Sequence, residues 1–98
     1  MNLAVAFRRA ARVEFIEPAA WYESQRPGLG VEFIAEIERC LDAAAERPTT
    51  YAAVDKDVRR VVANRFPFSV YFRGEERRIV VLAVFHGRRD PSIWQQRT

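Results

Sequence analysis

The sequence predicts a single α+β domain in which one β-sheet carries two helices on one of its faces. An apolar stripe at helical spacing runs through residues 33–45, and three short β-type segments follow between residues 58 and 86. No repeat, low-complexity tract or linker divides the 98 residues, which are enough for one hydrophobic core. We therefore expect residues 1–98 to form one domain of the α+β class.

Two helices are expected in the first half of the chain. From Arg9 to Gln25 apolar residues recur every three or four positions, as on one face of a helix, and Pro18 is expected to kink this helix. Proline and glycine within residues 26–28 end it. The second helix has its apolar stripe opposite a charged face and stops at Pro48. Because the break between them is short, the two helices are expected to pack as an antiparallel hairpin.

Four segments are predicted to form the sheet. A short apolar run, Leu3–Phe7, supplies an N-terminal strand. Val58–Ala63, Phe68–Arg73 and Arg78–His86 are joined by segments short enough for hairpin turns, so they are expected to form a three-stranded antiparallel meander. The last of these strands is almost entirely apolar. This pattern predicts a central strand that is buried on both faces, with the N-terminal strand as its second neighbour.

Charge is divided unevenly along the chain. Residues 1–58 carry 7 basic and 10 acidic side chains, a net charge of −3, whereas residues 59–98 carry 9 basic and 3 acidic side chains, a net charge of +6. Among the 16 basic residues only Lys56 is a lysine. An anionic partner, either nucleic acid or an acidic protein segment, is therefore expected for the C-terminal part.

The composition disfavours several classes of function. Cys40 is the single cysteine, which excludes an internal disulfide and a thiolate metal site, and its place on the apolar stripe favours a core residue over a reactive thiol. With one histidine and scattered glycines, no metal site, phosphate-binding loop or cofactor is expected. The longest apolar run, Ile79–Phe85, is too short to span a membrane, and the N-terminus shows no secretory signal. A cytoplasmic protein is therefore expected.

Several short motifs follow one another in a distinctive order. They are the helix–break–helix segment Trp21–Glu38, the pair Arg59-Arg60, the segment Phe66–Phe68 and the strand end Val84–Pro91. In this order, over about residues 5–94, they resemble the RelE/ParE superfamily, the toxin components of bacterial toxin–antitoxin pairs. The first motif resembles the ParE-like branch. The resemblance implies the same fold, a strand followed by a helix hairpin and a three-stranded meander.

The resemblance implies the toxin of a type II toxin–antitoxin module, neutralised by a cognate antitoxin of the ParD or RelB kind that is encoded nearby. ParE-like members inhibit DNA gyrase and are not enzymes, whereas RelE-like members cut messenger RNA on the ribosome. The sequence has no tyrosine after Tyr71, and Trp94 takes the terminal aromatic position, where an indole has no acid–base capacity near neutral pH. We therefore expect a ParE-like gyrase inhibitor. The alternatives are a RelE-like ribosome-dependent ribonuclease and a non-toxic member that only binds partners.

Candidate site residues come from the charged and aromatic end of the last strand and from its neighbours. Those expected to bind the target are Arg60, Tyr71, His86, Arg88, Arg89 and Trp94. In a nuclease, the catalytic set would come from Lys56, Arg60, His86, Arg88 and Arg89. Arg88, Arg89 and Trp94 combine charge with an aromatic anchor, and these residue types are enriched at binding hot spots.

Most of these residues also have a plain structural interpretation. His86 is either a general base or a strand-end residue bonded to nearby backbone. Tyr71 either lines a nucleic-acid groove or packs in the sheet. Arg59 and Arg60 point to opposite faces of their strand, so only one can share a face with the C-terminal cluster. The other is expected to pair with a nearby aspartate or with solvent. Trp21 is expected to pack within the helix hairpin.

Overall fold

The computed structural model describes residues 3–97 and confirms the predicted α+β fold. Five strands form one mixed sheet in the order β1-β5-β4-β3-β2. The strands are β1 (Ala4–Phe7), β2 (Ala53–Asp55), β3 (Val58–Val62), β4 (Phe68–Gly74) and β5 (Arg78–His86). β1 runs parallel to β5, and every other neighbouring pair is antiparallel. As predicted, β5 lies between two strands and is buried on both faces, while β4 holds the middle position.

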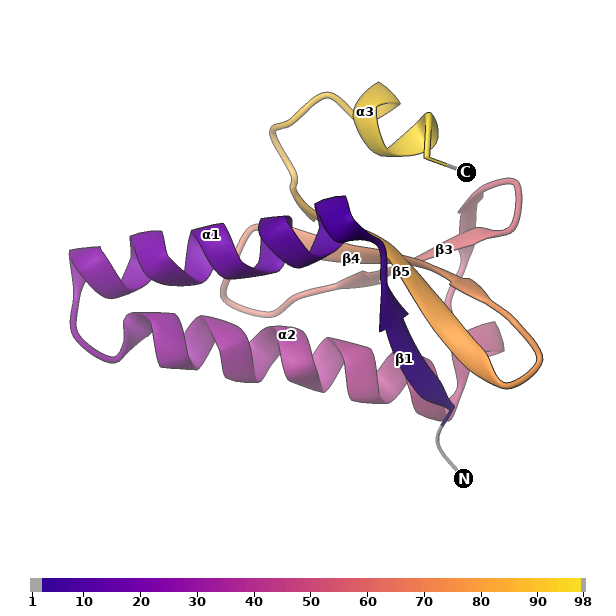
Figure 1. The fold of residues 1–98 in the computed structure, drawn as a ribbon, viewed down its shortest axis with the longest axis horizontal. Helices are drawn as coiled ribbons and strands as arrows, with labels where there is room; N and C mark the ends of the chain where they lie inside the picture. Colours follow the sequence, from indigo (N-terminus) through magenta and orange to yellow (C-terminus); the bar gives the residue numbers. More distant parts are fainter. Residues whose placement is uncertain (1–2, 98) are drawn as a thin grey trace.

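Two long helices cover one face of this sheet. α1 (Arg9–Gln25) and α2 (Leu29–Glu46) lie side by side as an antiparallel hairpin whose turn projects past the strands (Figure 1). α1 continues through Pro18 as one helix. A 3₁₀ turn, η1 (Pro48–Thr50), follows α2, and a four-residue helix, α3 (Ser92–Gln95), follows β5. None of the helices within residues 3–97 is long and apolar enough to cross a membrane.

The turn between the long helices depends on a glutamate and two glycines. Gly28 adopts a left-handed backbone conformation with a φ of 89°, which favours glycine. The carboxylate of Glu23 in α1 accepts the N–H of Gly28 at 2.9 Å and that of Gly30 at 3.0 Å, so it satisfies donors at the start of α2. A Cβ at Gly30 would lie 2.5 Å from the carbonyl oxygen of Ala19. The close approach of the two helices therefore requires glycine at this position.

The structure contains one strand, β2, that the sequence analysis does not predict. β2 pairs with β3 through a two-residue turn at Lys56 and Asp57, and it forms one edge of the sheet. Lys56 adopts a φ of 52° in this turn, a conformation usually taken by glycine or asparagine, so no hairpin signature marks the turn in the sequence. β2 has only three residues, too few to show an alternating pattern.

The main core lies between the helix hairpin and the sheet. Phe33 in α2 is fully buried at its centre. Its ring makes tilted or edge-to-face contacts with four other rings, at centroid distances between 5.1 and 6.4 Å. These rings belong to Phe15, Tyr22, Phe66 and Phe68. The aromatic cluster therefore joins both long helices to the β3–β4 loop and to the start of β4.

Cys40 is a core residue, as expected. Its side chain is fully buried in α2. Burial raises the pKa of the Cys40 thiol to about 11, so little of the reactive thiolate exists at neutral pH. The geometry thus favours the core interpretation over a reactive thiol.

A second, smaller core lies on the opposite face of the sheet. There Trp94 of α3 is 3% exposed. Its ring stacks on Tyr71 of β4 at a centroid distance of 4.2 Å and an interplanar angle of 24°. The other members of this cluster are Val58, Val80, Leu82, Ala83 and Phe85. The two long helices thus share one face, as predicted, and α3 adds a cover on part of the other face, which we call the second face.

Glu36 connects α2 to the loop after β3. Its carboxylate accepts hydrogen bonds from the Arg39 guanidinium at 2.7 and 2.8 Å and from the N–H of Asn64 at 2.6 Å. The hydrogen bonds from Arg39, helped by the one from Asn64, lower the pKa of Glu36 from 4.5 to about 2. A lowered pKa means that the carboxylate stabilises the fold fully above pH 4.5, and that this stabilisation is lost as the pH falls toward 2.

Replacing Glu36 by glutamine is expected to lower the free energy of unfolding at neutral pH by about 1–2 kcal/mol, because charge-assisted hydrogen bonds are lost. Between about pH 5 and about pH 2.5 the Glu36→Gln chain should lose less stability than the wild type. Denaturant unfolding at a series of pH values measures both effects. Glu38→Gln, at an exposed position on the same helix, is the matched control. If Glu36→Gln and wild type showed the same pH slope, the assigned role of Glu36 would be wrong.

Candidate functional site

The candidate site surrounds the end of β5 and the segment, residues 87–91, that leads from it to α3. The N–H of Gly87 donates to the carbonyl of Pro67 at 2.9 Å, which fixes the exit from the strand. The carboxylate of Asp90 accepts the N–H of Ser92 at 3.0 Å at the start of α3. These contacts fix the backbone on both sides of the two arginines of this segment.

His86 is half-buried at the end of β5, on the helix side of the sheet. Its ring meets that of Phe68 edge to face at a centroid distance of 5.2 Å. Nδ1 of His86 accepts the backbone N–H of Arg88 at 3.0 Å. The geometry agrees with the interpretation of His86 as a strand-end residue bonded to nearby backbone.

Arg59 and Arg60 point to opposite faces of the sheet, as predicted. Arg59 donates a hydrogen bond to the carbonyl of Tyr51, so its partner is backbone, whereas an aspartate or solvent was expected. Arg60 is exposed on the second face, directly across from Tyr71 in the register of β3 and β4. Within residues 3–97, Arg60 forms no ion pair.

Trp94, expected to be an aromatic anchor for the target, is instead a core residue. It is almost fully buried because its ring fills the second core against Tyr71. Its Nε1 is buried as well and has no hydrogen-bond acceptor among residues 3–97. The structure therefore assigns Trp94 a packing role, in which it holds α3 against the sheet. Tyr71, half-buried under Trp94, likewise agrees with the packing interpretation.

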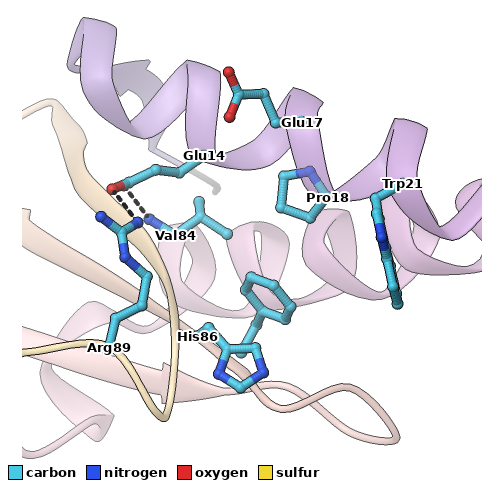
Figure 2. A pocket seen from close by; sticks show the side chains of 8 residues that line it. Glu14, Glu17, Pro18, Trp21, Val84, His86 and Arg89 are labelled. Atoms are coloured by element: carbon cyan, nitrogen blue, oxygen red, sulfur yellow. Dashed lines mark hydrogen bonds and ion pairs between the residues drawn. The ribbon is translucent and has the colours of Figure 1, made fainter.

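A cluster of charges connects the C-terminal segment to α1. The side chain of Glu14 is 10% exposed and accepts hydrogen bonds from both terminal guanidinium nitrogens of Arg97, at 2.9 and 3.0 Å. The same carboxylate accepts a bond from Arg89 at 3.3 Å and from the N–H of Val84 at 3.1 Å (Figure 2). Arg97 also donates to the carbonyl of Leu82 at 3.0 Å. Sequence patterns give no sign of this cluster, because Glu14 and Arg97 are 83 positions apart.

The two arginines of the 87–91 segment differ in whether their side chains have a partner within the protein. Arg89 binds Glu14, and its guanidinium also lies over the ring of Phe85, 4.2 Å from the centroid, so it is held against the protein although its side chain is 46% exposed. Arg88 is exposed, and its side chain makes no ion pair with any residue in 3–97. Arg88 therefore offers its charge to solvent or to a partner.

The candidate residues occupy different parts of the molecule. Arg60 lies on the second face, while His86 lies on the helix side. Lys56, a candidate only for a nuclease, sits in the turn between β2 and β3 at the edge of the sheet. The structure therefore brings His86 and Arg89 together on one groove beside α1 but does not gather the whole proposed nuclease set around one point.

An open groove lies between α1 and the end of the sheet. It has a volume of about 460 Å³ and is lined by Pro18, Trp21, Tyr22, Phe68 and His86. Figure 2 shows Pro18 and Trp21 projecting from α1 on the side where His86 lies. Trp21 is 59% exposed, so the expectation that it packs within the hairpin is wrong for most of its surface. A periodic apolar pattern does not reveal that this end of α1 extends past the strands.

Comparison with known proteins decides the family. The sequence matches the family described as the ParE toxin of type II toxin–antitoxin systems, parDE, over residues 5–91. The chain belongs to the ParE toxin family. Among solved structures it is similar to one described as a chromosomal ParDE TA system from P. aeruginosa, with a TM-score of 0.74 and 18% sequence identity, covering 87% of this chain and 96% of that chain. At that identity the likeness shows the fold. No curated protein matches the sequence.

Membership of the ParE toxin family confirms the resemblance seen in the sequence motifs. The matched range includes Arg60, His86 and both arginines of the 87–91 segment, and it ends one residue before α3. Trp94 and Arg97 therefore lie beyond it. Residues 3–97 of this ParE-family chain contain no group of three or more His, Cys, Asp or Glu side chains placed to hold a metal ion.

Proposed function

We propose that this ParE-family chain is a toxin that inhibits DNA gyrase by binding it, without chemistry of its own. The observation that carries the proposal is the dispersal of the candidate catalytic residues. Arg60 and His86 lie on opposite sides of the sheet and Lys56 lies at its edge, so they do not surround one reacting group. A binding surface has no such requirement, because its contacts spread over a patch. The proposed activity takes place in the cytoplasm, where gyrase works.

The proposed gyrase-binding surface is the segment of residues 87–91 with its two arginines. Arg88 has no ion-pair partner within residues 3–97, and Arg89 is still 46% exposed beside it. The surface belongs to the part of the chain, residues 59–98, whose net charge is +6. Positive charge of this kind suits a target that holds DNA, because arginines can contact phosphates as well as acidic side chains.

Replacing Arg88 by alanine is expected to raise the toxin concentration needed for half-maximal gyrase inhibition about tenfold, since a hot-spot arginine contributes more than 1 kcal/mol to binding. Arg77→Ala is the matched control, because Arg77 is an exposed arginine in the β4–β5 turn, outside the proposed surface. Supercoiling assays over a range of toxin concentrations compare the two chains. Loss of inhibition in Arg77→Ala but not in Arg88→Ala would place the binding surface elsewhere.

A ribosome-dependent ribonuclease is the second candidate function, because Arg60 and Tyr71 lie across from each other on the second face. Arg60→Ala separates the two functions. It is expected to abolish RNA cutting by a nuclease but to leave most gyrase inhibition intact, since Arg60 lies outside the 87–91 segment. The chain would be expressed in bacterial cells, messenger RNA ends mapped, and gyrase–DNA complexes recovered. Messenger RNA cuts that vanish in Arg60→Ala, without gyrase–DNA complexes, would overturn the proposal.

We also propose that a cognate antitoxin of the ParD kind, encoded beside this chain, neutralises it. The similar solved structure is described as a ParDE TA system. Apolar surface is available in the groove beside Trp21 and on the outer helix faces, where Ile16 is 58% and Val31 67% exposed. An acidic and apolar antitoxin tail suits this surface together with the nearby arginines. Co-expression with the neighbouring small gene is expected to give a stable complex and to restore growth. Absence of both results would count against the antitoxin.

A further inference from the structure

We infer that Glu14 is a positioning residue, whose carboxylate holds the 87–91 segment and α3 in the arrangement that binds the target. Glu14 lies in the second turn of α1, outside the 87–91 segment, and contacts that segment through Arg89, so it acts through other residues. The inference rests on the proposed function, because that function makes the 87–91 segment the binding surface. Three features of the structure support it.

The first feature is the unpaired edge of β5. The register of β1 with β5 ends at Val81, so beyond that point no strand among residues 3–97 pairs with this edge of β5. Backbone donors and acceptors at such an edge need other partners. Glu14 accepts the N–H of Val84, and Arg97 donates to the carbonyl of Leu82. The Glu14–Arg97 pair therefore satisfies backbone groups of β5 that no strand pairs with, and it attaches the C-terminal segment to this edge of β5.

The second feature is the number of groups held by one carboxylate. Arg97, just beyond α3, binds Glu14 through both terminal guanidinium nitrogens, and Arg89 binds it from the segment before α3. One side chain of α1 thus fixes the C-terminal segment on both sides of the short helix. Loss of Glu14 would release both contacts together and leave the packing of Trp94 as the main contact that holds this four-residue helix on the sheet.

The third feature is the burial of the pair. The side chain of Glu14 is 10% exposed and that of Arg97 is 21% exposed, so the contact is largely shielded from water. Removing one partner of such a pair leaves the other charge poorly compensated. The most direct response is for the C-terminal segment to move away from α1, which would expose Trp94.

Glu17 provides a matched control on the same helix. It follows Glu14 by one helical turn, it is exposed, and Figure 2 shows its carboxylate pointing away from Arg89 and Val84. Glu17→Gln removes the same charge from the same helix without touching the C-terminal segment. A general effect of charge on α1 would therefore appear in both variants, whereas a positioning effect would appear only in Glu14→Gln.

Fluorescence quenching tests the positioning role without gyrase. In chains that carry Trp21→Phe, Trp94 is the only tryptophan, and it is buried when α3 is docked. Acrylamide quenching in the Glu14→Gln chain is expected to rise toward that of the denatured chain, while circular dichroism stays close to that of wild type. The Glu17→Gln chain should keep Trp94 protected. A Glu14→Gln chain whose Trp94 remains as protected as in wild type would overturn the inference.

Gyrase inhibition tests whether the positioning role of Glu14 matters for binding the target. Glu14→Gln is expected to need about tenfold more toxin for half-maximal inhibition, with no change for Glu17→Gln. Arg97→Lys keeps the positive charge but loses the contact through two nitrogens, so it should inhibit gyrase better than Arg97→Gln. If only the packing of the Arg97 side chain mattered, the two variants would not differ in this way. Wild-type inhibition by Glu14→Gln would overturn the inference. A wild-type chain that leaves gyrase unaffected would overturn the proposed function instead, and quenching would then decide the role of Glu14.

Discussion

Replacing Phe33 by alanine is expected to lower the free energy of unfolding by about 3–5 kcal/mol, the range found for deletion of a buried aromatic ring. Phe33 is fully buried, and its ring contacts four other aromatic rings from both sides of the main core. Alanine leaves a cavity there and also removes ring pairs that contribute about 0.5–1.5 kcal/mol each beyond their buried area. Denaturant unfolding monitored by circular dichroism measures the loss.

Ile34→Ala is the control for this substitution, because Ile34 is the next residue of α2 and is 38% exposed. Its free energy of unfolding should stay within about 1 kcal/mol of wild type, as is usual for substitutions near the surface. Since small domains are stable by only about 5–15 kcal/mol, the loss expected for Phe33→Ala is a large fraction of the whole. If Ile34→Ala cost more than Phe33→Ala, the main core would not be centred on Phe33.

Replacing Trp94 by alanine is expected to cost about 3 kcal/mol and to abolish most gyrase inhibition. Trp94 is almost fully buried, stacks on Tyr71 and forms the main contact of α3 with the second face. Without this ring α3 should detach, and the 87–91 segment that precedes it should lose its fixed geometry. Denaturant unfolding and a supercoiling assay on the same preparation measure the two effects.

Trp94→Phe separates packing from direct contact with the target. Phenylalanine retains a ring on Tyr71 and removes the buried Nε1–H, which has no acceptor among residues 3–97. Relief of that unsatisfied donor should offset much of the lost volume, so stability is expected within about 1 kcal/mol of wild type. Gyrase inhibition should then also remain. A stable Trp94→Phe chain that fails to inhibit gyrase would mean that the indole itself contacts the target.

Most of the fold is predictable because its long elements carry strong local patterns. The stripe around Phe33 and Ile37 spans several helical turns, and the apolar run of β5 requires neighbours on both sides. The position of β1 beside β5 follows from that requirement. Such patterns repeat over many residues, so chance agreement is rare.

The two short elements have no such pattern. β2 contains three residues, and its turn places Lys56 in a conformation that the residue type does not signal. α3 contains four residues, and tertiary contact through Trp94, not helical periodicity, holds it in place. Elements of this length are determined by the surface on which they pack, which a local reading of the sequence does not contain.

The candidate site was predictable in residue type but not in arrangement. The arginines at the end of β5 stand out because a strand rarely ends in so many cations. Burial of Trp94 and exposure of Trp21 depend instead on where α1 and α3 end relative to the sheet. Glu14 is the clearest omission, because its contacts with Arg89 and Arg97 join parts of the chain at least 75 positions apart.

The most direct test of the central claim is a gyrase assay on supercoiled plasmid with the purified chain, freed of any antitoxin. Gyrase, plasmid and ATP are incubated with increasing amounts of folded chain, and linear, protein-linked DNA is quantified. The proposed function predicts that linear DNA accumulates with toxin concentration. Unchanged supercoiling and no cleaved DNA, with a chain that circular dichroism shows to be folded, would exclude gyrase as the target and make the ribosomal ribonuclease the leading function.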